Sequence, residues 1–334
     1  TPRFWGKHYG KWCMLWLLSL VLALTLKSGW QATLHLVMHA LVLDYLPFIV
    51  LIGSLYIITS AIHVHTEYQV TPWTNTVYLG LGGLLASLIG TTGASLILIR
   101  PLIRLNQRRT YSTHIFIFFI FVVSNIGGAL TPIGDPPLFM GFLKGVPFFW
   151  PLVHLGPITF FTLGLVLGAF FCMESYFLKK EGGQASLNFH FRVDGKLHVA
   201  LLACAILSVL LSGIFSSGPH LNLFGLTISV ASLLRDLALM VLAGISYKAA
   251  SSNKSHRNHI AWHPIEEVAI LFLAIFVTMI PVVELVKLYS FKPQTDFAYF
   301  FVTGLLSSFL DNTPTYLVFF NVAGGNPLEL IGPL

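Results

Sequence analysis

Two aspartates stand at interruptions of otherwise apolar segments. Asp135 lies in the string SNIGGALTPIGDPP at residues 124–137, and Asp311 lies in the string LDNTP. Proline prevents normal helix continuation, so both aspartates are expected where a membrane helix opens. Unwound backbone at that depth persists only where protein, ions or water satisfy it. A carboxylate taken out of water can hold either a proton or a small cation, so these residues are candidates for an ion-binding site within the membrane.

Neutral oxygens accompany both interruptions and could complete a Na⁺ site at Asp135 and Asp311. Unwound backbone carbonyls and the C-terminal ends of half-helices would add to them. The expected ligands carry hydroxyl or amide groups: Thr91, Thr92, Ser95, Asn125, Thr131, Asn312 and Thr313. Each residue also has a structural alternative, because an aspartate can cap a helix and the others can satisfy freed backbone groups. A carboxylate substrate stays open, although the nearest intramembrane cation, Arg100, is expected to snorkel to the interface.

The composition is that of a polytopic membrane protein. The chain has 334 residues, of which 55% are hydrophobic and 10% charged, with a mean hydropathy of +0.79. Such values lie outside the usual range of soluble domains. Apolar stretches long enough to cross a bilayer occur at residues 12–28, 41–62, 114–143, 150–178, 197–215, 223–247 and 265–288. Two further stretches, 77–103 and 297–322, are interrupted in the middle. We expect an all-α fold.

The net charge of +6 reflects basic loops rather than a nucleic-acid site. Lys and Arg cluster in short connections between apolar spans, as the positive-inside rule predicts for cytoplasmic loops. The clusters are Arg3, Lys7 and Lys11; Arg100, Arg104, Arg108 and Arg109; Lys179, Lys180, Arg192 and Lys196; and Lys248, Lys254 and Arg257. Residues 216–223 contain no Lys or Arg and should face outward. This predicts a cytoplasmic N-terminus in an inner or plasma membrane, with lipid as partner.

Other polar residues indicate no second site. The carboxylates near span ends are expected to be solvated at the interface: Asp44, Glu174, Glu266, Glu267 and Glu284. Arg235 and Asp236 are neighbours on a helix and are not expected to pair. His35 and His39 have metal-ligand spacing, but too few further ligands accompany them for a di-iron centre. We therefore expect no cofactor, and Na⁺ and H⁺ would be transported ions.

A repeat relates the two interrupted stretches. A shift of 221 residues lays Leu84–Leu96 over Leu305–Leu317, with a serine and a threonine coinciding at the break. A shift of 220 lays Leu51–Ile62 over Leu271–Val282. A helix followed by a broken hairpin thus recurs in the same order, as expected for a genuine repeat.

Crossing counts predict that the repeats are inverted. Counted from a cytoplasmic N-terminus, span 41–62 ends on the cytoplasmic side, and the Arg cluster after residue 99 belongs on that side too. Residues 77–103 should therefore be a re-entrant hairpin with its turn near residues 90–93. Residues 297–322 should then enter from the outside. We expect a single transmembrane domain over 1–334, with one repeat at 36–190 and another at 256–334. Inverted repeats with opened hairpins are typical of secondary transporters.

Four strings carry a resemblance to a known family. They are LPFIVLIGSLYIITSAI at 46–62, GTTGASLILIRP at 90–101, SNIGGALTPIGDPPLFMGFLKGVPFFWP at 124–151, and LDNTPTYLVFFNVAGG at 310–325. In these strings the chain resembles the ion transporter superfamily, and most closely its NhaD-type sodium/proton antiporter branch, which includes citrate-transporter-like relatives. The motif around SNIGG and TPIGDPP fixes the superfamily better than the substrate.

The resemblance implies an elevator-type carrier that works as a homodimer. Its ion site would lie among two hairpin tips, Thr91–Ser95 and Asp311–Thr315, and the opened helix around Gly127–Asp135. Relatives continue into a further broken helix that nothing here matches, so we expect a C-terminally truncated chain.

The sequence-based interpretation is a sodium/proton antiporter that exchanges Na⁺ or Li⁺ for H⁺ and is not an enzyme. The alternatives are a sodium-coupled carrier of a citrate-like carboxylate and an efflux permease for an oxyanion such as arsenite. A membrane enzyme ranks third, because it has less reason to show this symmetry.

Overall fold

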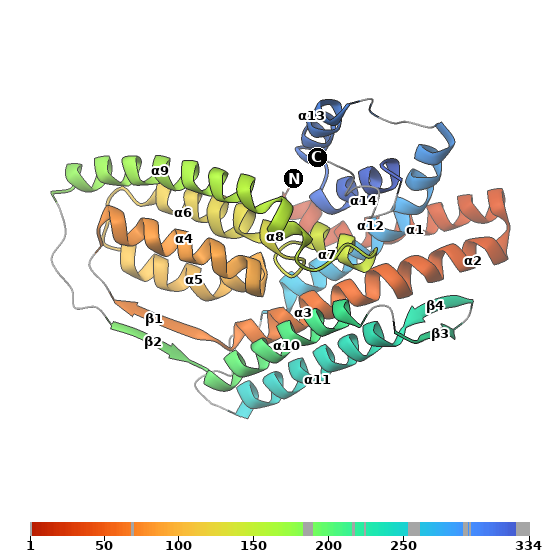
Figure 1. Ribbon diagram of the computed structural model, residues 1–334, viewed down its shortest axis with the longest axis horizontal. Coiled ribbons are helices and arrows are strands. Elements are labelled where there is room, and N and C mark those ends of the chain that lie inside the picture. The colour runs from red at the N-terminus through yellow and green to blue at the C-terminus, as the bar shows by residue number, and fades with distance from the viewer. Residues whose placement is uncertain are drawn as a thin grey trace.

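The structure is a computed structural model that describes residues 2–67, 70–182, 190–215, 218–223, 225–252, 261–289, 293 and 295–324. Helices dominate it, as the composition predicts (Figure 1). In the first half the elements are α1 Pro2–Ser28, α2 Trp30–His39, the π-helix η1 Ala40–Tyr45, α3 Leu46–Ser60, β1 His63–Glu67, α4 Pro72–Ile89, α5 Thr91–Asn106, α6 Thr113–Phe119, the π-helix η2 Ile120–Asn125, the 3₁₀-helix η3 Ile126–Leu130, α7 Pro136–Leu143, α8 Trp150–His154 and α9 Gly156–Lys180. The second half contains β2 His190–Asp194, α10 Lys196–Ile214, β3 His220–Leu223, β4 Leu226–Ser229, α11 Val230–Ser252, α12 Trp262–Tyr289, α13 Asp296–Ser307 and α14 Asn312–Val322.

Seven helices among the described residues are long and apolar enough to cross a membrane. They cover His8–Ser28, Trp30–Ser60, Thr113–Leu130, Gly156–Lys180, Lys196–Ile214, Val230–Ser251 and Trp262–Leu285. Each overlaps one of the spans predicted from the sequence, which confirms a multi-pass membrane protein. The second starts earlier than predicted, because α2, η1 and α3 follow one another as a single long rod.

Both interrupted stretches form helical hairpins. In the first, which we call hairpin 1, α4 packs against α5 and the chain turns at Gly90. Gly90 has φ 83°, a left-handed conformation that glycine adopts without strain. In the second, hairpin 2, α13 packs against α14. Its second helix begins at Asn312, 221 residues after the first residue of α5, so the two breaks coincide under the sequence shift.

The expectation of a purely helical chain is wrong in two places. Strand β1 pairs with β2 although Glu67 and its partner His190 are 123 positions apart in the chain, and β3 pairs with β4 in a short hairpin. The second pair replaces the start of the predicted span 223–247, so α11 begins only at Val230. Short strands with β-branched residues between polar ones carry too weak a signal beside long apolar helices.

The core centres on α3. Helices α10 and α11 lie along one side of α3 (Figure 1), and α5, α7 and α12 also contact it. Phe48 of α3 packs against two aromatic rings of α12, at centroid distances of 4.5 Å from Phe272 and 5.5 Å from Phe276. Helices α4, α5, α6 and α9 form a neighbouring group, while α7 contacts α14 of hairpin 2. The two predicted site regions therefore meet at α7.

Candidate functional site

The segment around Asp135 is an opened helix. From α6 the chain widens into η2, tightens into η3, and leaves helical geometry at residues 131–135 before α7 begins. Pro136 and Pro137 occupy the first turn of α7, where a missing N–H leaves no helical hydrogen bond unmade. The predicted break therefore exists, and Asp135 is its last residue.

Two glycines let the opened helix lie against hairpin 1. A Cβ atom on Gly127 would come within 2.7 Å of the Cα of Gly83. A Cβ atom on Gly128 would come within 2.8 Å of a methyl group of Thr91. Real Cβ atoms do not approach that closely, so the contact depends on glycine at both positions.

Hydrogen bonds tie the same surfaces together. The Ser87 hydroxyl donates to the carbonyl of Gly127 and accepts from the backbone N–H of Leu130 at 3.3 Å. Thr131, a predicted ligand, is buried and donates its hydroxyl to the carbonyl of Ser87. At the hairpin tip the backbone N–H of Thr91 donates to the carbonyl of Gly134 at 3.1 Å. These bonds satisfy the unwound backbone, as an opened helix at membrane depth requires.

Asp135 occupies the N-cap position of α7, yet its side chain makes no capping bond. The Asp135 carboxylate also has no hydrogen-bond or ion-pair partner in the part of the chain that the structure describes. It lies at the wall of two cavities. One is small, about 40 Å³, and includes Thr91 and Thr92. The other is about 550 Å³ and includes Asn312. The carboxylate thus stands between the tips of both hairpins.

Asp311 is placed close enough to interact electrostatically with Asp135. It is exposed and precedes α14 as the N-cap residue, without a side-chain capping bond. Its backbone carbonyl accepts the Thr315 hydroxyl at 3.1 Å. The structure therefore brings the two predicted aspartates together from segments that lie far apart in the sequence.

The remaining predicted ligands, Ser95, Thr313 and Asn125, have different surroundings. Ser95 lines a groove of about 510 Å³ beside Thr91 and Thr92, where its hydroxyl lies 2.9 Å from that of Ser124. Thr313 is buried, and its hydroxyl has no hydrogen-bond partner among the described residues. Asn125 is exposed and lines none of these three cavities. Thr131, Thr313 and Asp311 do not line them either, so the predicted residues at these cavities are Asp135, Thr91, Thr92, Ser95 and Asn312.

The larger cavity has polar groups that sequence reasoning missed. Thr303 and Ser307 line it from α13, and Tyr299 and Tyr316 contribute phenol rings. Thr303 and Ser307 are four residues apart, so they share one helix face that leads to the predicted tip. That spacing of hydroxyl residues in the sequence could have indicated that this face of α13 lines a polar cavity.

The two cavities at Asp135 differ from the basic loops in the charge of their lining residues. Neither cavity that contains Asp135 has a Lys, Arg or His among its described lining residues. Acidic and neutral oxygens therefore face the space between the hairpins, which favours a cation as ligand.

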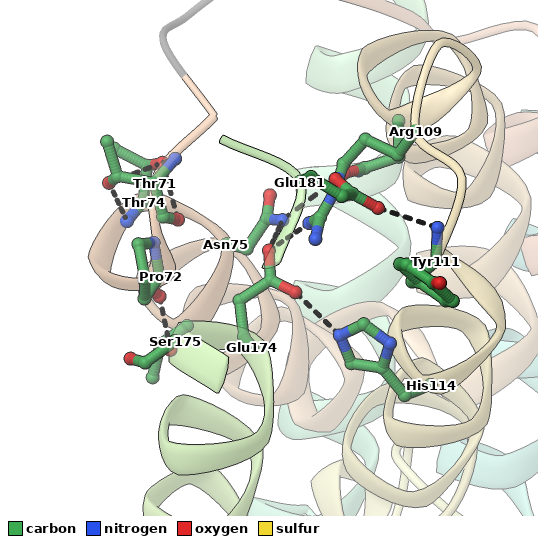
Figure 2. Close-up of polar contacts among 12 residues, drawn as sticks. Thr71, Pro72, Thr74, Asn75, Arg109, Tyr111, His114, Glu174, Ser175 and Glu181 are labelled. Atoms are coloured by element: carbon green, nitrogen blue, oxygen red, sulfur yellow. Dashed lines mark hydrogen bonds and ion pairs between the residues drawn. The ribbon is translucent and has the colours of Figure 1, made fainter. Parts of the chain in front are cut away.

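A second polar cluster lies where α4, α6 and α9 come together, and Figure 2 shows it. Glu174 of α9 has no exposed surface. Its carboxylate accepts hydrogen bonds from Asn75 at 2.8 Å, from His114 at 2.6 Å and from Arg109 (Figure 2). Arg109 also donates to Glu181 at 2.9 Å.

This cluster corrects one expectation. Glu174 was expected to be solvated at the interface, but its side chain is fully buried, as is the side chain of Arg109 from the predicted basic cluster. Their positions 65 residues apart in the chain hide the pairing from local patterns. Glu174 has too many donors around it to serve as a free ligand.

A second expectation is also wrong, because the adjacent residues Arg235 and Asp236 do form an ion pair, with Nε 2.8 Å from Oδ1. Both are buried near the start of α11. Of the other carboxylates expected to be solvated, Asp44 instead accepts from Lys144 at 2.6 Å. No group of three or more possible metal ligands occurs in the described part of the chain.

Comparison with known proteins gives one family. The model of a family described as "Putative citrate transport" matches residues 1–334. The match is consistent with the wider ion transporter superfamily that the motifs indicated. No curated protein and no solved structure matches the chain.

Proposed function

The chain belongs to the family described as "Putative citrate transport". We propose that it is a secondary transporter that binds a cation at Asp135. We further propose that it exchanges Na⁺ or Li⁺ for H⁺. One observation carries this proposal most directly. The side chain of Asp135 has no hydrogen-bond partner among the described residues, and Asp135 lines a cavity whose described lining contains no Lys, Arg or His.

The proposed chemistry is competition between a proton and Na⁺ for one carboxylate. A carboxylate in a poorly hydrated site binds either ion, but not both at once. Thr91 and Thr92 would supply oxygens from hairpin 1, while Asn312 would supply one from hairpin 2. Asp311 would add a second negative charge. Movement of the tips against the opened helix would then expose the site to one side of the membrane at a time.

Citrate is the second candidate substrate, and the family description favours it. The cavity of about 550 Å³ is large enough for a small polycarboxylate, and Asn312, Thr303 and Tyr316 offer donors. Citrate carries several negative charges and would lie near Asp135. It would therefore need to enter together with cations, which predicts sodium-coupled transport.

The wider features of the resemblance belong to the same proposal. We place the carrier in an inner or plasma membrane, with a cytoplasmic N-terminus, as a homodimer of elevator type with inverted repeats. The distribution of Lys and Arg over the loops supports the orientation. The coinciding breaks of the two hairpins support the repeat.

The test uses the purified chain in proteoliposomes with a pH-sensitive dye inside. Wild type, Asp135→Asn and Asp311→Asn are challenged with NaCl, LiCl, choline chloride, sodium citrate and choline citrate. We expect Na⁺ and Li⁺ to drive proton movement in wild type, choline to drive none, and both variants to lose the response.

Labelled citrate uptake in the same vesicles separates the two substrates. Uptake of citrate that requires Na⁺, without any response to NaCl alone, would overturn antiport and establish the second candidate. Exchange that survives in both variants would move the cation site away from Asp135.

A further inference from the structure

A cavity of about 240 Å³ lies at the far end of hairpin 1 from its tip. The end of α3, strand β1 and the second half of α5 enclose it, together with Asp194 of β2. Its ionisable lining residues are Arg100, Arg104, Asp194, His63 and His65. None of the residues proposed to bind the transported ion lines it. It is therefore separate from the site at Asp135.

The two arginines of this cavity are exposed residues, and the carboxylate beside them already has other partners. Asp194 already lies 2.8 Å from the Nε of Arg192 and 3.4 Å from the Nε2 of His65. Arg100 and Arg104 have no hydrogen-bond or ion-pair partner in the part of the chain that the structure describes. They are four residues apart on α5, so both guanidinium groups leave the same helix face.

The chemistry of this pair fits an oxyanion. A guanidinium is a planar fork of N–H donors that matches phosphate and carboxylate oxygens. Two forks from one helix face can share the several oxygens of a tetrahedral dianion, whereas a single carboxylate is satisfied by one. From this geometry we propose that the cavity binds a phosphate group between Arg100 and Arg104. The group would come either from soluble phosphate or from the headgroup of an anionic lipid.

Binding there would act on hairpin 1. Helix α5 starts at the tip residue Thr91 and carries both arginines near its other end. Its Gly93 is so close to α3 that an added Cβ would lie 3.0 Å from a methyl group of Thr59, which itself lines the cavity. A phosphate between α5 and the α3–β1 junction would hold the hairpin arm against α3. The site would then regulate the proposed hairpin movement rather than carry substrate.

The test measures binding of labelled inorganic phosphate to the full chain in nanodiscs of zwitterionic lipid, repeated with phosphatidylglycerol present. The variants are the double substitution Arg100→Gln/Arg104→Gln and the pair Arg100→Lys/Arg104→Lys. Arg108→Gln is the matched control, because Arg108 is exposed like Arg100 and Arg104 but lies in the turn after α5 and does not line the cavity. Native mass spectrometry records retained phosphatidylglycerol.

We expect saturable phosphate binding by wild type and Arg108→Gln, and an affinity at least about tenfold lower in the Gln double variant, because charge-assisted hydrogen bonds are lost. The Lys pair should bind with intermediate affinity, because it keeps the two positive charges but loses the planar donor forks. Phosphatidylglycerol that displaces phosphate, and is retained less by the Gln variant, assigns the site to lipid.

Equal binding of phosphate and lipid by wild type and the Gln double variant would overturn the proposal, as would binding of neither. Binding of citrate in place of phosphate would overturn the phosphate assignment. Asp135→Asn separates this inference from the proposed function, because it should retain phosphate binding whether or not Na⁺ exchange is found.

Discussion

Glu174 and Asp135 are two carboxylates placed among membrane helices, and their surroundings are opposite. Glu174 is fully buried in a regular helix and accepts bonds from three side chains. Asp135 ends a stretch of opened backbone, and its side chain has no hydrogen-bond partner among the described residues. The first carboxylate faces protein on all sides, while the second faces a cavity.

The difference shows how to distinguish a structural carboxylate from a ligand-binding one. A buried charge whose oxygens are all occupied by donors stabilises the helices that provide them, and it has no capacity left for an ion. A carboxylate without donors is stable only if a proton, a cation or water satisfies it. Removal of Glu174 should therefore harm folding, and removal of Asp135 should harm transport.

The largest expected effect is that of Asp135→Asn on transport. Loss of one charged partner of a desolvated ion pair removes about 3 kcal/mol or more, so cation-driven exchange should fall at least about a hundredfold. Because no described residue depends on this carboxylate, the melting temperature in detergent should stay close to that of wild type. A variant that loses activity only by unfolding would contradict the assignment of Asp135 as a binding group.

The next effect is that of Glu174→Ala on stability. It leaves Arg109 and His114 buried without their carboxylate, and removing one partner of a buried ion pair costs about 3–5 kcal/mol. Thermal unfolding monitored by size-exclusion chromatography measures the loss. Glu266→Ala is the control, because Glu266 is exposed near the start of α12. If the two variants unfold at the same temperature, the cluster contributes no stability.

Gly127→Ala should have an intermediate effect at the contact between the opened helix and hairpin 1. The added methyl group would collide with the backbone of Gly83, and such overpacking costs about 1–3 kcal/mol. Gly164→Ala adds the same methyl group in α9, where nothing lies within 4 Å. Unfolding temperatures and Na⁺-driven exchange of the two variants should differ. Equal behaviour would show that the close approach is not needed.

Ser95→Ala should have the smallest effect on stability, because it removes one hydroxyl bond to Ser124, worth about 0.5–1.5 kcal/mol. The same variant tests whether Ser95 binds the cation or, like Glu174, has a structural role only. If Ser95 is a cation ligand, the Na⁺ concentration for half-maximal exchange should rise while the unfolding temperature changes little. An unchanged Na⁺ dependence would leave Ser95 with a structural role only.

Much of the fold follows from local sequence. Long apolar stretches must become helices in lipid, because no other partner satisfies their backbone, so the seven spans could be found in advance. Glycine and proline fix where helices open, which made the turn at Gly90 and the break before Asp135 predictable. The sheet between β1 and β2 was not predictable, since its strands lie far apart in the chain and are short.

The candidate site was predictable only in part. Sequence indicated both aspartates and the threonines of the first hairpin tip, because polar residues at a break have few other reasons to occur there. It could not show that Asn125 would be exposed outside these cavities while Tyr316 would line one. Which face of an irregular segment meets a partner depends on the packing of the whole chain.

The sequence by itself thus determined the class of protein, its membrane helices and the positions of its breaks, since these depend on local hydrophobicity and backbone geometry. Tertiary structure alone decided which charged groups have partners. It buried Glu174 among donors from three other segments and left Asp135 facing a cavity. The physical reason is that desolvation and hydrogen bonding are set by neighbours in space, and these neighbours come from distant parts of the chain.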